Sequence, residues 1–229
     1  MFSQENPQAS VYSQSLEIQR SIPAIQAQAE ELGYPVDWMS ISGGPAGGCL
    51  ALLYAYRDGA ASPLPMRAVF EMVGPPSFCH EDWGIYGLAE GTQDSHAAAA
   101  GLFSVMAGQE ITPGMIAANS YTEQIRGISA DMWVTEQSPP TLAAYGVHDR
   151  ICSFPSVARL IRALEQHHVP YDYIEFPHSG HGLRNDGRLY EAYMDKMEEY
   201  LDKYTQQAQK SAPAGFPPDR GAPNILDLY

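Results

Sequence analysis

Apolar strand-like segments alternate with helix-like segments along most of this chain. The strand-like segments are 36–42, 67–73, 141–145 and 171–176, and the main helical patterns are 11–32, 49–56, 155–168 and 186–204. Strands that alternate with helices form βαβ units, whose crossovers make neighbouring strands run parallel. The sequence therefore predicts an α/β fold with three layers, in which helices cover both faces of a parallel sheet of about four strands.

The region 74–138 separates the second strand-like segment from the third. It has no strand pattern, but the segments 95–107, 113–119 and 121–128 have helical patterns. We therefore expect a small helical cap-like insertion within a single domain that spans residues 1–204. Residues 205–229 are rich in proline and glycine and lack periodicity, which predicts a mobile tail.

Acidic residues outnumber basic residues by 27 to 13, so the net charge is −14. Such a surface repels phosphate backbones and anionic lipid headgroups, so we expect neither nucleic acid nor a membrane as a partner. The irregular spacing of Cys49, Cys79 and Cys152 predicts neither a disulfide framework nor a zinc site. The first residues lack the basic and apolar regions of a signal peptide, which favours a cytoplasmic location.

Residues suited to chemistry follow three of the strand-like segments. The carboxyl ends of parallel strands meet at one edge of the sheet, and ligands bind there. The glycine-rich run 43–48 follows the first segment, Asp149 follows the third, and His181 follows the fourth. A glycine-rich turn, an aspartate and a histidine in this order match the chain order of the catalytic triad in α/β-hydrolases.

The segment 41–52 resembles the nucleophile elbow of carboxylesterases and related lipases. It reads Ile-Ser-Gly-Gly-Pro-Ala-Gly-Gly-Cys-Leu-Ala-Leu, where that family has Gly-Gly-Ser-Ala-Gly-Gly at its centre. The stretch from 139 to Asp149 is similar to the acid strand of the family, and Ser-Gly-His-Gly around His181 is similar to its histidine loop. The resemblance covers about residues 11–204 and corresponds to the C-terminal two-thirds of an α/β-hydrolase.

This resemblance implies a small carboxylic ester as ligand and no metal or organic cofactor. In the family a serine attacks the ester, and the positions of His181 and Asp149 are those of its base and the orienting acid. The backbone N–H of Ala46 occupies the position of an oxyanion donor in the elbow. Gly44 lies within the elbow, and Gly43 and Gly47 are expected to leave room for a tight turn.

Pro45 occupies the nucleophile position. Proline has no hydroxyl group, so no acyl-enzyme can form there, and its ring fixes φ near −65°, whereas the elbow nucleophile usually has a positive φ. The origin of this proline is open between three alternatives, which are natural loss of function, an engineered block and a sequence variant. Ser42 is interpreted as a hydrogen-bonded residue at the strand end and not as a substitute nucleophile, and Cys49 as a core residue.

The resemblance also implies that strands and an oxyanion loop that precede the elbow in the family are missing from this chain. We therefore expect an N-terminally truncated hydrolase fold in which the strand 36–42 lies at the edge of the sheet. An unpaired, mostly apolar edge strand favours self-association, so a homo-oligomer formed through this edge is expected.

Three functions follow as hypotheses. The first is an esterase or lipase homologue that is inactive in this form. The second is a non-catalytic ligand-binding or interaction module that reuses the hydrolase pocket. The third is an enzyme that activates a water molecule with His181 and Asp149, and it is the weakest of the three because neutral water is a poor nucleophile without a metal. For each of them we expect Asp149 to contact the Nδ1 atom of His181.

Overall fold

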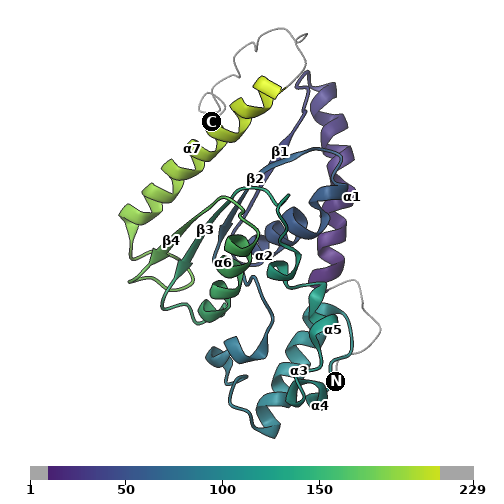
Figure 1. Ribbon diagram of the computed structural model, residues 1–229, viewed down its shortest axis with the longest axis vertical. Helices are drawn as coiled ribbons and strands as arrows, with labels where there is room; N and C mark the ends of the chain where they lie inside the picture. The colour runs from purple at the N-terminus through teal and green to yellow at the C-terminus, as the bar shows by residue number, and fades with distance from the viewer. Residues whose placement is uncertain (1–9, 212–229) are drawn as a thin grey trace.

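The sheet has four parallel strands within residues 10–211, the part of the chain that the computed structural model describes (Figure 1). The strands are β1 (Met39–Gly43), β2 (Met66–Met72), β3 (Thr141–Gly146) and β4 (Tyr171–Phe176). Their spatial order is β1-β2-β3-β4, and each neighbouring pair is parallel. The predicted α/β class and the parallel sheet are therefore confirmed.

Helices cover both faces of this sheet, as the alternation of side chains along the strands requires. Helix α7 (Gly187–Ser211) covers one face, where Phe70 and Leu142 are buried against it. Helices α2 (Pro45–Leu53) and α6 (Val157–Gln166) cover the other face, towards which Val69 points. Helix α1 (Val11–Glu31) packs beside α2 on the same side (Figure 1).

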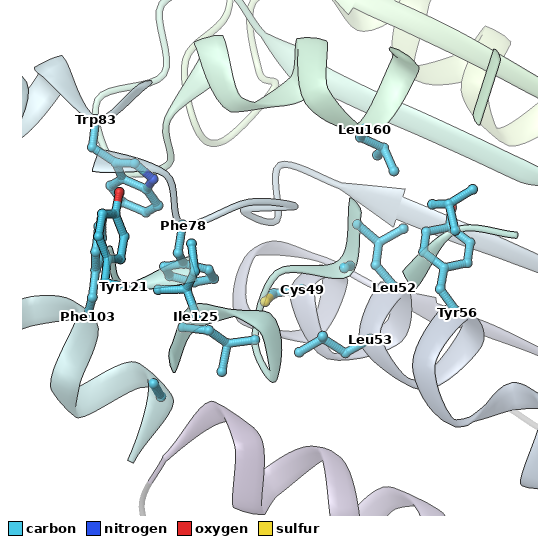
Figure 2. Close-up of a cluster of buried hydrophobic side chains, with 14 of the residues drawn as sticks. Cys49, Leu52, Leu53, Tyr56, Phe78, Trp83, Phe103, Tyr121, Ile125 and Leu160 are labelled. Carbon is cyan, nitrogen blue, oxygen red and sulfur yellow. The ribbon is translucent and has the colours of Figure 1, made fainter. Parts of the chain in front are cut away.

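The segment between β2 and β3 contains α3 (Gln93–Ala107), α4 (Pro113–Ala117) and α5 (Thr122–Arg126). These helices lie together at one end of the molecule (Figure 1). The side chains of Phe78, Phe103 and Tyr121 are buried in one cluster with Cys49 and Leu52 of α2 (Figure 2). The insertion therefore shares its core with the elbow helix and does not form a separate core.

Several predicted boundaries were wrong. The helix expected at 49–56 begins earlier, at Pro45, because this proline can occupy the first turn of a helix. The last helix continues to Ser211, so the first residues of the expected tail at 205–229 are helical. Residues 212–229 of that tail lie outside the described residues, as do residues 1–9.

Strand β1 lies at an edge of the sheet, as predicted. Its hydrogen-bonded neighbour is β2, and β1 ends the spatial order on that side. All six residues of β3, in the middle of the sheet, are buried, whereas four of the five residues of β1 are half-buried and Ser42 is exposed. Within residues 10–211, no helix has the length and apolar character needed to cross a membrane.

Candidate active site

The elbow is the short connection from β1 to α2. Strand β1 ends at Gly43, Gly44 has extended backbone angles (φ −111°, ψ 171°), and Pro45 is the first residue of α2. A Cβ atom on Gly43 would lie 2.2 Å from the carbonyl carbon of Gly47, so the close approach of the strand and the helix requires glycine at this position.

Pro45 occupies a position where proline is well tolerated. The N–H group of a first-turn residue has no partner within the helix, and the fixed φ of proline suits the start of a helix. Neither Gly44 nor Pro45 is among the described residues with a positive φ. The chain therefore passes from strand to helix without the strained conformation expected of an elbow nucleophile.

The other glycines of the elbow differ from expectation. Gly47 was expected to supply space, but a Cβ atom on it would have no neighbour within 4 Å, and the same is true of Gly44. Gly48 is the crowded position, because its Cβ atom would lie 2.9 Å from the Oε1 atom of Glu71. Ala46 lies in the first turn of α2, where backbone N–H groups lack partners within the helix.

Asp149 follows β3 in a tight turn. Its Oδ1 atom accepts hydrogen bonds from the backbone N–H groups of Ile151 (2.7 Å) and Cys152 (3.0 Å). Its Oδ2 atom lies 2.9 Å from Nδ1 of His181. The side chain of Asp149 is 1% exposed and that of His181 is 24% exposed. The predicted contact is therefore present, with the carboxylate held inside the protein and the imidazole at its surface.

The loop that carries His181 is anchored by Asp186, directly before α7. The carboxylate of Asp186 accepts hydrogen bonds from the Ser179 hydroxyl (2.6 Å) and from the backbone N–H of His178 (3.1 Å), and it pairs with the His178 ring (2.8 Å). Burial opposes its ionisation, but these hydrogen bonds outweigh burial and lower the pKa of Asp186. The sequence did not identify Asp186 as a residue of the site.

Glu71 is a second residue that the sequence did not single out. It is near the end of β2, is completely buried, and points towards α2. Its Oε1 atom accepts a hydrogen bond from the backbone N–H of Gly74, and its Oε2 atom has no hydrogen-bond partner within the described residues. Burial raises the pKa of Glu71 well above its usual value. A charged residue inside the apolar run 67–73 was the signal available in the sequence.

Asp149, Cys152 and His181 carry potential metal-ligating atoms that lie within 4.8 Å of one another. The facing oxygen of Asp149 and nitrogen of His181 are already hydrogen-bonded to each other. We call Asp149 and His181 the acid–base pair, after the carboxylate and the imidazole that face each other in it. The thiol of Cys152 is buried, and this burial raises its pKa, which disfavours a nucleophilic thiolate.

A shallow hollow of about 130 Å³ lies elsewhere. Met66 at the start of β2 and Pro139 shortly before β3 line it, together with Tyr56. These residues place the hollow at the amino ends of the strands, opposite the edge that carries Asp149 and His181. It therefore does not belong to the candidate site.

Comparison with known families connects part of the chain to a family of peptidases. The prolyl oligopeptidase family matches residues 109–208, which include Asp149 and His181 but not the elbow. No curated protein matches the chain in sequence.

Solved structures similar to this fold include several hydrolases. Esterase B from Lactobacillus rhamnosis is similar with a TM-score of 0.62 and 16% identity over 89% of this chain. An esterase from Thermogutta terrifontis has a TM-score of 0.59 and 18% identity over 85% of this chain. An acetyl ester-xyloside bifunctional hydrolase from Caldicellulosiruptor lactoaceticus has a TM-score of 0.56 and 18% identity over 82% of this chain. This chain spans 65% of the length of each of the three.

Proposed function

We propose that this chain, which has part of an α/β-hydrolase fold, is a homologue of carboxylic-ester hydrolases whose catalysis is impaired by Pro45. The observation that carries the proposal is the 2.9 Å contact between the Asp149 carboxylate and His181 Nδ1, at the same end of the sheet as an elbow in which residue 45 has no hydroxyl group. Parallel strands bring the elbow, Asp149 and His181 to the same edge of the sheet.

The chemistry that these residues support is incomplete. In a serine hydrolase the histidine takes a proton from the serine hydroxyl, and the aspartate orients the imidazole and stabilises its charged form. Asp149 is suited to this role because two backbone N–H groups hold its other oxygen. Pro45 offers no proton to remove and no oxygen to acylate, so the nucleophilic step has no starting group.

The alternative is a non-catalytic ligand-binding or interaction module that reuses the hydrolase pocket. The same acid–base pair supports it, because His181 is partly exposed and can donate to or accept from a small ester-like ligand. In this case we expect a rise in melting temperature with ligand and no turnover.

Turnover of a chromogenic short-chain ester tests the proposal, with a matched anilide added because of the match to a peptidase family. We expect the wild-type chain to show no turnover of either substrate above the uncatalysed rate. Turnover that disappears in His181→Ala would overturn the proposal and support activation of a water molecule by the acid–base pair. A rise in melting temperature with an ester analogue, again without turnover, would favour the binding module.

A further inference from the structure

The turn that follows β2 has a strained backbone. Val73 has φ of 52°, a left-handed conformation that is costly for a β-branched residue. Its side chain is 3% exposed, and its backbone N–H donates to the carbonyl of Ala144 (2.9 Å). Strain of this kind persists only where the surrounding structure holds the backbone firmly, and it occurs mainly at functional sites.

Both polar groups of the Gly74 residue are held by buried side chains. Its N–H donates to Oε1 of Glu71, and its carbonyl accepts a hydrogen bond from the Tyr145 hydroxyl (2.8 Å). Glu71 and Tyr145 are at most 1% exposed, so water does not compete for these bonds. We call this arrangement of Glu71, Tyr145 and Gly74 the Gly74 clamp.

The Gly74 clamp lies directly against the elbow. A Cβ atom on Gly74 would lie 2.7 Å from the carbonyl oxygen of Pro45 and 2.4 Å from the backbone nitrogen of Cys49. Glu71 also touches the elbow helix, because Gly48 leaves just enough room for its Oε1 atom. Movement of Gly74 towards α2 is therefore blocked by the first turn of this helix, and the helix is blocked in return.

We propose that Glu71 is a positioning residue that fixes the nucleophile elbow through the Gly74 clamp. Its carboxyl group holds the backbone of Gly74, and Gly74 lies against the carbonyl oxygen of Pro45. The carboxyl group is not itself a reacting group. This assignment rests on the proposed function only in taking the elbow as the centre of the site. Burial raises the pKa of Glu71 and outweighs the opposing hydrogen bonds of Gly74 and Tyr145, so it favours the neutral carboxyl group.

Hydrogen exchange at individual backbone amides tests the proposal without requiring activity. The variants are Glu71→Leu, which removes the acceptor, and Glu71→Gln, which keeps an acceptor oxygen and imitates a neutral carboxyl group. Tyr200→Phe is the matched control, because it removes a buried hydroxyl from α7 on the other face of the sheet. We expect Glu71→Leu to speed exchange at Gly74, Gly48 and Cys49 about tenfold more than in α6.

Glu71→Gln should leave the exchange of these amides near the wild-type rates, and Tyr200→Phe should not single them out. Equal acceleration of elbow and α6 amides in Glu71→Leu would overturn the proposal, because Glu71 would then contribute only to overall stability. Disruption by Glu71→Gln as severe as that by Glu71→Leu would also overturn it, because an ionised carboxylate would then be required.

A second measurement uses the Pro45→Ser background and a fluorophosphonate probe. The labelling rate should fall with Glu71→Leu and recover with Glu71→Gln, while Tyr200→Phe changes it little. Unchanged labelling with Glu71→Leu would overturn the positioning role. If Pro45→Ser accepts no label at all, the result bears on the hydrolase proposal, and the exchange rates alone decide the role of Glu71.

Discussion

The elbow and the acid–base pair lie at the same end of the sheet, where the strands have their carboxyl ends. They differ in which features of the family motif they contain. Around the elbow, Gly43 and Gly48 keep the close packing of strand, helix and Glu71, yet residue 45 is a proline in a relaxed first helical turn. At the acid–base pair, Asp149 and His181 keep both their residue types and a 2.9 Å contact. The family match at residues 109–208 includes this pair and excludes the elbow.

The difference shows that the scaffold of a site and its reacting group are specified separately. The elbow packing depends on several backbone contacts, and none of them needs a hydroxyl group at residue 45. The acid–base pair depends on two loops and on anchors such as Asp186, which lie far from residue 45 in the sequence. Under the proposed function, one substitution at residue 45 therefore removes the nucleophile while the contacts around it keep their form.

The largest expected effect is at the elbow. Loss of a triad nucleophile typically lowers turnover by about a million-fold. We therefore expect the wild-type chain to react with a fluorophosphonate probe at a rate about that much below that of an ordinary serine esterase. Labelling is measured by mass spectrometry of the intact chain and its peptides. Rapid labelling of Ser42 would contradict this, because it would make the exposed strand serine a nucleophile.

Restoring serine should recover little. Pro45→Ser supplies the hydroxyl, but the turn must also become strained. One oxyanion donor commonly contributes about 3 kcal/mol, and the family takes such donors partly from a loop before its elbow, where the described residues 10–38 contain helix α1. We expect ester turnover to remain at least about a hundredfold below that of ordinary esterases. The double variant with His181→Ala is the control. Full activity of Pro45→Ser would show that another segment completes the oxyanion hole.

Glu71 should make the free energy of unfolding depend on pH. Its pKa is raised in the folded state, so above its ordinary value of 4.5 the unfolded chain loses a proton that the folded chain keeps. The contribution to stability therefore falls as pH rises, by up to about 1.4 kcal/mol per pH unit until the folded pKa is reached. Gln cannot titrate, so the stability of Glu71→Gln relative to wild type should increase as the pH rises from 5 to 8.

Denaturant unfolding of both proteins across this pH range measures the difference. The remaining groups titrate alike in the two proteins, so they cancel in the comparison. A stability difference that does not change with pH would mean that Glu71 is ionised in the folded protein at the lower pH.

Asp149→Ala should destabilise the fold itself. The substitution removes the acceptor of the backbone N–H groups of Ile151 and Cys152, and loss of the buried partner of Cys152 costs about 1–3 kcal/mol. Thermal or denaturant unfolding measures the loss, with the exposed Asp94→Ala as control. An equal and small effect of both variants would show that the turn after β3 does not depend on this carboxylate.

The smallest expected effect concerns the edge strand β1. We propose that two copies pair weakly through β1, against the net charge of −14. Ser42→Lys adds a lysine to the edge and should weaken association measured by sedimentation at micromolar concentration. Gln109→Lys makes the same charge change on an exposed loop and should not weaken it. A wild-type monomer throughout this range would contradict the proposal.

The sequence alone determined the order of strands and helices and the residues at their ends. Alternating apolar segments predicted the parallel sheet because this pattern is local and repeats along the chain. Asp149 and His181 were predicted because they follow strands whose carboxyl ends must share an edge. The identity of Pro45 is likewise a fact of sequence, and it already excludes an acyl-enzyme at this position.

The tertiary structure decided which residues pack against, or hydrogen-bond to, the residues at the strand ends. Gly47 resembled a spacer in the motif, yet the crowded glycines are Gly43, Gly48 and Gly74, because crowding depends on what a distant segment places opposite them. In the sequence, Glu71 is a charged residue in an apolar segment. Only the packing of β2 against α2 shows that its side chain is buried. Spacing along the chain records which residues are near each other in sequence, whereas burial and hydrogen bonding depend on segments that only folding brings together.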